Sequence, residues 1–266
     1  MDIPGIQELQ FYTLFYDFIF YSFLGWILET CYASFTTRGF VNRGFLNGPF
    51  CPVYGFGAVL IVCVLTPVRN DAFLLFILGT FLTSLLEYIT GYILEKAFHT
   101  KWWDYSQRRF HLHGRICLPF SILWGILSVV LLQTLHPATC YLITLIPVPA
   151  GKVILFFLAG YFILDVAFSA GTVLRLNHRL KQIHLLSEEI SARLGYVKRL
   201  SLPASIEELQ RKVLELTLRR EKLVNRKMVF HTRLLKAFPG IQSLGFDKTL
   251  KEIKSRIRAL QKKGKD

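Results

Sequence analysis

The first 171 residues of the sequence carry little charge, and that charge is balanced, with nine Lys and Arg against nine Asp and Glu. No basic residue precedes Arg38, so the basic segment that opens a secretory signal peptide is missing and we expect no cleaved signal. None of the five cysteines forms a CxxC pair, which argues against a disulfide framework. The sequence also lacks a G-x-x-x-x-G-K-[ST] phosphate loop, which excludes an ATPase of that type.

Apolar and aromatic residues are abundant instead. Hydrophobic residues make up 52% of the chain and aromatic residues 14%, a composition typical of membrane proteins. The last third differs, because residues 172–266 hold 23 Lys and Arg against nine Asp and Glu and so account for the whole net charge of +14. We therefore expect a transmembrane domain over residues 1–174 and a basic cytoplasmic helical tail over residues 175–266.

Five apolar segments approach the length of about 20 residues that a helix needs to cross a bilayer. They cover residues 11–35, 53–68, 72–95, 116–135 and 152–174. The stretch 137–150 is apolar but short and rich in proline. It is interpreted as a re-entrant or interfacial piece or as a continuation of the fourth span, a sixth span being less favoured.

The positive charges of the connections indicate the orientation of these spans. The connections 36–52 and 96–115 carry two and five Lys and Arg, whereas 69–71 and 136–152 carry one each. An alternating arrangement then places the N-terminus outside and the two charged connections and the tail in the cytoplasm. Asp17 lies nearer the outer interface, where we expect it to be hydrated.

Two regions of the transmembrane domain resemble each other and predict an internal parallel repeat. The first copy contains Ser22, Gly25, Glu29, the run NGPFC at 47–51 and Gly55. The second contains Thr80, Thr83, Glu87, the run HGRIC at 113–117 and Gly125. Parallel repeats are common in transporters, whose sites lie at the repeat interface. The alternative is a chance similarity between two helix hairpins.

Glu29, Glu87 and Asp165 are acidic residues that fall inside predicted spans. A charge in the bilayer costs several kcal/mol unless it is paired or hydrated, so such residues often mark a cation or proton site or a substrate path. No span carries a basic residue near its middle, and Arg43 and Arg115 are the nearest candidate partners. The alternative is that the acids only fix helix packing.

The connection NRGFLNGPFCPVYGFG, from Asn42 to Gly57, is unusually rich in residues with special backbone properties. Backbone that is not helical is tolerated at membrane depth only where it is buried in protein or lines a wet cavity. The amides of Asn42 and Asn47 are suited to satisfy such backbone groups, and Arg43 offers a permanent charge. The pattern predicts a packed turn that binds a phosphate or a carboxylate.

The second connection combines Trp102, Trp103 and three basic residues, which suits the level of the lipid headgroups. His111, His113 and Cys117, with Cys51 as a fourth ligand, raise the alternative of a zinc site. The spacing His-x-His-x3-Cys is a weak signal, and we expect neither a metal nor another cofactor.

The runs YSFLGWILETCY and FVNRGFLNGPFCPVYGFG, followed by WWDYS and HGRICLPFSILWG, resemble the bacterial family known as Putative ABC-transporter type IV, also called CmpB-like permease. The resemblance covers roughly residues 11–170 and implies a multi-span bacterial membrane protein with a role in transport. The motif positions of the first block are Glu29, Asn42, Arg43, Gly44, Asn47, Gly48, Pro49, Cys51, Tyr54 and Gly55. Those of the second block are Trp103, Asp104, Tyr105, Gly114, Arg115 and Cys117, and this sequence departs by having histidine at 111 and 113 where the family leads us to expect asparagine-like residues.

The tail has the pattern of amphipathic helices. The first apolar face comprises Leu176, Leu180, Ile183, Ile190, Leu194 and Val197. After a break at Pro203, a capping box of Ser205 and Glu208 predicts a second long helix that ends near Ala237. A third begins at Asp247, with Leu250, Ile253, Ile257 and Leu260 on one face. This helical hairpin or coiled coil is interpreted as a homo-oligomerisation element or a solvated appendage. The alternative is docking to anionic lipid, to a partner or to nucleic acid, and nucleic acid ranks last.

Together these features predict an all-α, polytopic membrane helix bundle with a helical tail. The favoured function is a transporter permease subunit that works with a separate ATPase, and we expect no catalytic residues. The alternative is a membrane scaffold or regulator that acts through its tail, and a membrane enzyme is disfavoured because no nucleophile and base are legible. The candidate residues of a substrate or ion pathway are Glu29, Asn42, Arg43, Asn47, Tyr54, Glu87, Asp104, Arg115 and Asp165.

Overall fold

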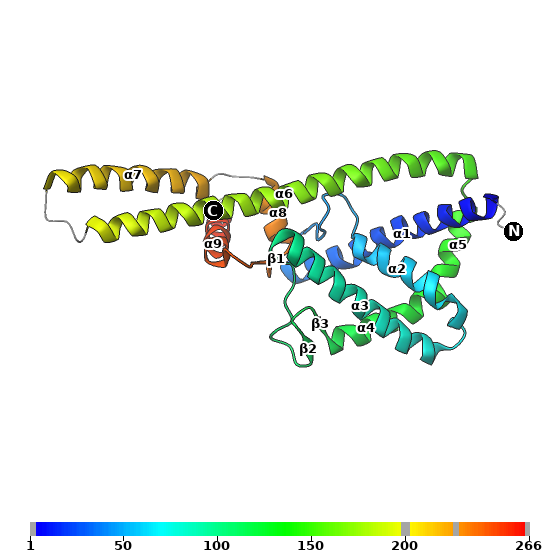
Figure 1. Cartoon of the computed structure of the whole chain (residues 1–266). Helices are drawn as coiled ribbons and strands as arrows, with labels where there is room; N and C mark the ends of the chain where they lie inside the picture. The colour runs from blue at the N-terminus through cyan, green and yellow to red at the C-terminus, as the bar shows by residue number, and fades with distance from the viewer. Residues whose placement is uncertain (1–3, 198–202, 226–228, 264–266) are drawn as a thin grey trace. The chain divides into compact units, whose positions relative to one another are not determined.

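A computed structural model of the chain describes residues 4–197, 203–225 and 229–263 and is almost entirely helical there (Figure 1). The helices are α1 (Pro4–Thr37), α2 (Pro52–Leu65), α3 (Ala72–Phe98), α4 (Leu118–Val130), α5 (His136–Thr144), α6 (Val148–Val197), α7 (Pro203–Asn225), α8 (Val229–Ala237) and α9 (Asp247–Lys263). A 3₁₀ turn η1 (Thr66–Val68) follows α2, and a π-helical turn η2 (Leu131–Leu135) joins α4 to α5. The strands are β1 (Thr100–Lys101), β2 (His111–Leu112), β3 (Ile116–Cys117) and β4 (Gln242–Ser243), paired antiparallel as β1 with β4 and β2 with β3.

Four helical segments are long and apolar enough to cross a membrane. They are Phe11–Thr37, Ala72–Phe98, Leu118–Thr144 and Val148–Gly195. The remaining predicted span, 53–68, corresponds to the shorter apolar helix Pro52–Val68, whose 17 residues extend about 25 Å at 1.5 Å per residue. The structure therefore supports a multi-span membrane protein, and the count of five spans stays a prediction.

The proline-rich stretch after the fourth predicted span continues the same helix as far as Thr144. Pro137 has no backbone N–H for the carbonyl one turn earlier, and its ring crowds that carbonyl. The widened turn η2 lies at this point, between Leu131 and Leu135. Of the three interpretations of 137–150, continuation of the fourth span agrees with the structure as far as Thr144.

The chain divides into two compact units, each described by itself. The first contains residues 1–96 and 102–170, and the second contains residues 97–101 and 171–266. Helix α6 is unbroken over 50 residues and contributes to both units. The predicted boundary between residues 174 and 175 lies inside this helix and stays a prediction.

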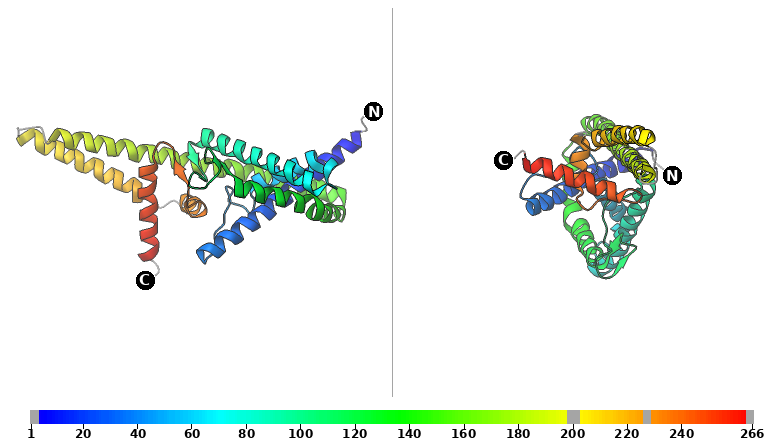
Figure 2. Two further views of the ribbon diagram at one scale, coloured as in Figure 1. Left: turned by 90° about the horizontal axis from the view of Figure 1, so that it is seen from below. Right: turned by 90° about the vertical axis from the view of Figure 1, so that its left-hand side faces the viewer.

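In the first unit, small residues allow pairs of helices to approach closely. A Cβ atom added at Gly55 of α2 would lie 2.5 Å from the carbonyl oxygen of Phe18 in α1. A Cβ atom added at Gly79 of α3 would lie 2.6 Å from the Cβ of Ser128 in α4. Helices α1 and α2, and likewise α3 and α4, therefore run side by side (Figures 1 and 2), in the small-residue packing common between membrane helices.

Two buried apolar clusters fill the first unit between these helices. One consists of Ile61, Leu65, Leu75 and Leu132 and joins α2, α3 and η2. The other consists of Ile19, Leu46 and Phe50 and joins α1 to the connection that precedes α2. Many large apolar side chains elsewhere on these helices are exposed, as expected for surfaces that face lipid.

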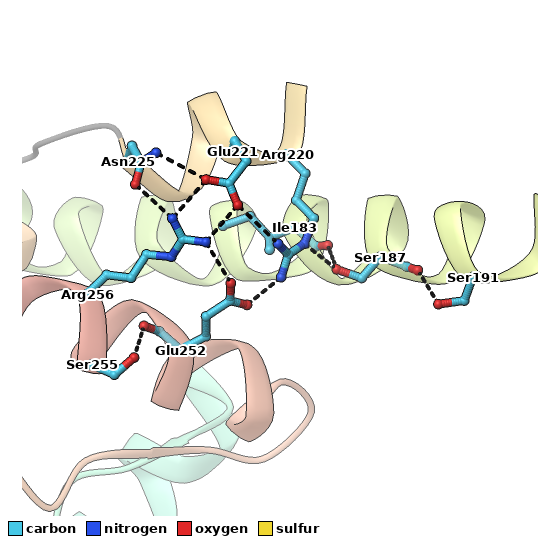
Figure 3. Close-up of polar contacts among 9 residues, drawn as sticks. All are labelled: Ile183, Ser187, Ser191, Arg220, Glu221, Asn225, Glu252, Ser255 and Arg256. Atoms are coloured by element: carbon cyan, nitrogen blue, oxygen red, sulfur yellow. Dashed lines mark hydrogen bonds and ion pairs between the residues drawn. The ribbon is translucent and has the colours of Figure 1, made fainter. Parts of the chain in front are cut away.

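In the second unit, α6 and α7 form an antiparallel hairpin. Arg179 Nε donates to the carbonyl oxygen of Leu223 at 3.0 Å, and Arg220 Nε donates to Ser187 Oγ at 2.8 Å. Arg256 of α9 contacts both carboxylate oxygens of Glu221 in α7, at 2.6 and 2.8 Å (Figure 3). These contacts tie α6, α7 and α9 together.

The helices of the tail differ from the prediction in three respects. Helix α7 begins at Pro203, before the predicted capping box, so Ser205 lies inside the first turn; proline is favoured at the start of a helix. The single long helix predicted up to Ala237 is two helices, α7 and α8, with residues 226–228 outside the described part. Leu194 is 47% exposed, although the earlier members of its face, from Leu176 to Ile183, are buried.

The third predicted tail helix is present as α9, which begins at Asp247. Its residues Leu250 and Ile253 are buried, as the predicted face requires. The side chains of Val197 and Leu260, which complete the predicted apolar faces, lie outside the described residues. The coiled coil itself stays a prediction.

Candidate functional site

The two charged connections of the first unit lie at the same end of its helices. The ring of Phe45, in the connection before α2, packs edge-on against Trp102, in the connection before α4, with 5.3 Å between centroids. Each connection ends in a cysteine with extended backbone, Cys51 or Cys117, that precedes a helix with proline in its first two positions. This end of the unit gathers most of the sequence-predicted site residues.

Glu29 is the centre of the first group of contacts. Arg43 Nε lies 3.1 Å from Glu29 Oε2, and the hydroxyl of Tyr54 donates to Glu29 Oε1 at 2.8 Å. Both charged side chains are about one-third exposed, 31% for Arg43 and 30% for Glu29, so the pair can contact water. The structure thus places Arg43 next to Glu29, as the sequence led us to expect.

Glu87 is the centre of the second group and has neutral partners. The hydroxyl of Tyr105 donates to its Oε1 and Trp124 Nε1 donates to its Oε2, both at 3.2 Å. Arg115, the expected partner, instead contacts Glu95 at 2.5 Å. The expectation of an Arg115–Glu87 pair is therefore wrong: Glu95 lies two turns further along α3, towards the connection from which Arg115 emerges.

The two groups touch each other through aromatic rings. Tyr54 and Trp124 are in edge-to-face contact, with 5.6 Å between ring centroids. Burial, followed by the charge of Glu87, raises the pKa of Tyr105 well above its usual range, and Glu29 acts in the same direction. Tyr105 thus stays a neutral hydrogen-bond donor between two acidic side chains.

Asp165 belongs to a separate group, where it holds the first connection against α6. Its Oδ1 accepts hydrogen bonds from the backbone N–H of Asn47 at 2.9 Å and from Asn47 Nδ2 at 3.1 Å. Its Oδ2 accepts from the backbone N–H of Gly48 at 2.7 Å, and the hydroxyl of Ser169 also contacts Oδ1. These contacts satisfy a buried carboxylate, so Asp165 has the environment of a structural residue.

Asn42 and Arg43 complete the first connection. Asn42 Oδ1 accepts a hydrogen bond from Trp26 Nε1 at 2.7 Å, and its Nδ2 donates to the carbonyl oxygen of Asn47 at 2.8 Å. Arg43 contacts Glu29, a carboxylate of the chain itself, and the binding of a phosphate or a carboxylate ligand at this turn stays a prediction. The asparagines satisfy backbone and indole groups, as expected for irregular backbone at this depth.

Asp104, His111, His113 and Cys117 shape the second connection. Asp104 Oδ1 accepts from the backbone N–H of Ser106 at 3.0 Å and closes a turn. His111 Nδ1 accepts from the backbone N–H of Gly114 at 3.2 Å, and His113 Nδ1 lies 3.0 Å from the hydroxyl of Tyr88. Within the described residues, no three His, Cys, Asp or Glu side chains are placed to hold a metal. The arrangement therefore gives the zinc alternative no geometric support.

Sequence reasoning missed two features of the first unit. Trp124 was not singled out, although an aromatic residue directly precedes the glycine in both copies of the repeat, as Tyr54–Gly55 and Trp124–Gly125. Asp17 was expected to be hydrated, but it is only 1% exposed and lies 3.7 Å from Nδ1 of His136 in α5. That expectation is wrong, because α5 covers the face of α1 that carries Asp17.

Comparison with known proteins identifies the first unit. The model of the family described as Putative ABC-transporter type IV matches residues 16–170, more than half of the chain. No curated protein and no solved structure matches the chain significantly.

Proposed function

Because the chain belongs to the family Putative ABC-transporter type IV, we propose that it is the permease subunit of a transporter, with its polar site at the connection end of the first unit. Four membrane-length helices and the transporter description of the family support this proposal. Since the sequence has no phosphate loop, a separate ATPase subunit would supply the energy, and the chain itself would carry no catalytic residue. The charged connections and the tail would face the cytoplasm of a bacterial cell.

The observation that carries the proposal is the pair of linked carboxylates. Glu29 has one cationic partner, Arg43, whereas the contacts of Glu87 within the described residues are the neutral donors Tyr105 and Trp124. The contact between Tyr54 and Trp124 joins the two groups into one site with an excess of negative charge. Such a site favours a cation or a proton over an anion.

The proposed parallel repeat explains why the two carboxylates have similar surroundings. In the first copy, Tyr54 precedes Gly55 and reaches Glu29; in the second, Trp124 precedes Gly125 and reaches Glu87. The helix contacts correspond as well. Gly55 lies against Phe18 and Ser22, and Gly125 lies against Phe76 and Thr80, each partner in α3 being 58 residues after its counterpart in α1. These matching contacts support a repeat whose two acidic sites meet at its interface.

The test is complementation of a deletion strain with full-length variants. We expect Glu29→Gln and Glu87→Gln, singly and together, to lose the transport-dependent phenotype while the protein still reaches the membrane. Glu189→Gln is the matched control, because Glu189 is an exposed tail residue that pairs only locally with Arg193. Full rescue by the double variant would overturn the proposed site. Failure of the purified complex to contain an ATPase subunit would overturn the ABC-type energy source.

A second candidate, a scaffold or regulator that acts through its tail, is favoured by the organised second unit. Glu221 and Glu252 link α7 to α9 there through Arg256 and Arg220, and Arg220 also donates to Ser187 of α6 (Figure 3). Its outer surface exposes Leu214 and Leu218, one turn apart on α7, as a face for a second copy or a partner. If Leu214→Glu with Leu218→Glu abolishes complementation and the Glu29 and Glu87 variants do not, the scaffold proposal replaces the permease. Nucleic acid stays the least favoured partner.

A further inference from the structure

A second acidic site lies towards the other end of α1. Asp17 precedes Glu29 by 12 residues, about 18 Å along the helix. Its partner His136 begins α5, and both residues lie within segments long and apolar enough to span the membrane. In the part of the chain that the structure describes, this site is separate from the Glu29–Glu87 group.

The Asp17 carboxylate is almost completely buried, at 1% exposure. Neither of its oxygens accepts a hydrogen bond from any residue in the described part of the chain. An ionised carboxylate left this way in an apolar environment costs several kcal/mol. A proton on the carboxylate, or a positive charge on the facing imidazole, removes that cost.

His136 is positioned to provide this charge. Its Nδ1 lies 3.7 Å from Asp17 Oδ1, and its Nε2 lies 3.5 Å from the thiol of Cys140. The hydroxyl of Tyr21 lies 3.4 Å from Nδ1 and donates to Thr139 at 3.2 Å. Histidine is the side chain whose charge ordinarily changes near neutral pH. One proton shared by the carboxyl and the imidazole leaves the pair with no net charge.

One fixed charge lies near His136. Arg69, which follows η1, is a fixed positive charge close enough to act on His136. The groups that face the pair are thus Tyr21 from α1, Cys140 from α5 and Arg69 from the connection before α3.

We propose that Asp17 and His136 form an intramembrane proton-binding site, which takes up and releases one proton between the carboxyl and the imidazole. Imidazole and thiol are poor ligands for alkali or alkaline-earth cations, which prefer several oxygen ligands. The chemistry of this site therefore favours a proton over a metal cation. The proposal does not depend on the transported substrate or on an ATPase partner.

The experiment follows the imidazole nitrogen signals of the full-length protein, labelled on histidine and reconstituted in nanodiscs, across a pH titration. His136→Gln assigns the His136 signals. We expect Asp17→Asn to lower the proton affinity of His136 by about tenfold, equal to about one pH unit, because the stabilising carboxylate is gone. His178 and His184 in the second unit are internal controls and should titrate unchanged. The contribution of one protonated carboxyl to the acid-minus-neutral infrared difference spectrum should also be lost in Asp17→Asn.

An unchanged His136 titration in a folded Asp17→Asn protein would overturn the proposal. If Asp17→Asn does not fold, Asp17→Glu replaces it, since it keeps the charge but moves the carboxylate by one methylene. The His136 midpoint should then shift while that of His178 stays, and an unchanged midpoint again overturns the proposal. Exchange of sodium for potassium at fixed pH should have no effect, and a shift caused by sodium would identify a cation site instead.

Discussion

Tyr54 and Trp124 touch edge to face, and each donates a hydrogen bond to a different intramembrane carboxylate, Tyr54 to Glu29 and Trp124 to Glu87. The two residues occupy equivalent places, directly before a glycine at which two helices approach closely. An aromatic side chain with one polar atom is well suited to this place, because its ring packs while its donor satisfies an acid. Each of the two carboxylates thus accepts a hydrogen bond from an aromatic side chain at the equivalent position.

The first prediction concerns these two donors. Tyr54→Phe and Trp124→Phe keep a ring in place but leave one carboxylate oxygen without its donor. We expect each variant to lose about 1.5–3 kcal/mol of stability, as for a hydrogen bond to a charged group. Thermal unfolding in detergent measures the effect. Tyr141→Phe is the control, since Tyr141 is 66% exposed. Equal melting temperatures for all three variants would contradict the prediction.

The second prediction concerns the close helix contacts. Gly55→Ala places a methyl group 2.5 Å from the carbonyl oxygen of Phe18, and Gly125→Ala places one 2.9 Å from the ring of Phe76. The carbonyl of Phe18 belongs to the backbone of α1 and cannot easily move away from the methyl group. We therefore expect Gly55→Ala to lose about 1–3 kcal/mol of stability and to have a lower melting temperature. Gly160→Ala in α6 is the matched control, because nothing lies within 4 Å of the added atom. The control should be neutral or slightly stabilising.

The sequence predicted the features that depend on local pattern. Apolar runs located the helices that are long enough to cross a membrane. The runs NGPFC and HGRIC marked two connections, and these lie at the same end of the first unit. The pairing of Arg43 with Glu29 was also predictable, because the arginine follows the same helix within one short connection.

The features that were missed depend on the packing of distant segments. Two acidic residues of α3, Glu87 and Glu95, were candidate partners for Arg115. It pairs with Glu95 because of the level along α3 at which the second connection places the arginine. Burial of Asp17 requires α5, whose place against α1 no local pattern encodes. The predicted boundary between residues 174 and 175 rests on a change of composition and lies inside the continuous helix α6, so it stays a prediction.

The third prediction concerns the hydrogen bonds between Asp165 and the first connection. Asp165→Asn replaces one acceptor oxygen with an NH₂ group that must face a donor, either the N–H of Gly48 or the groups of Asn47. A buried donor without an acceptor costs about 1–3 kcal/mol, so the melting temperature should fall. Asp71→Asn is the control: Asp71 is exposed and its Oδ1 accepts from the N–H of Leu74, which asparagine can also do. A similar change of melting temperature in both variants would argue against a stabilising role of the hydrogen bonds to Asp165.

The fourth prediction concerns the reactivity of Cys51. Burial, followed by the nearby charge of Glu29, raises the pKa of this thiol to about 12. Since the thiolate is the reactive form, alkylation should be slow at pH values where an ordinary thiol, with a pKa of about 8.5, reacts readily. The comparison uses a protein whose sole cysteine is Cys51 and one whose sole cysteine is Arg109→Cys, in the exposed second connection. We expect alkylation at Cys51 to be at least about a hundredfold slower, and comparable rates would contradict the assigned environment.

The fifth prediction concerns the pH dependence of the second unit. Hydrogen bonds from Arg256 lower the pKa of Glu221 below its usual range. A depressed folded-state pKa stabilises the fold above the unfolded pKa of about 4.3, and that stabilisation is lost as the pH falls through the folded value. Because both side chains are 36% exposed, solvent screening limits the effect to about 1 kcal/mol or less.

Arg256→Gln should therefore remove part of the acid sensitivity of α9, measured by hydrogen exchange of its peptides after correction for the intrinsic pH dependence of exchange. At neutral pH the variant should exchange faster than the wild type, and in acid the two should converge, since the protonated Glu221 no longer gains from the guanidinium. Arg193→Gln is the control, because the Arg193–Glu189 pair lies within α6 and links no second helix. If the α9 peptides exchange at the same rate in Arg256→Gln and in Arg193→Gln at every pH, the ion pair between α7 and α9 does not stabilise the second unit.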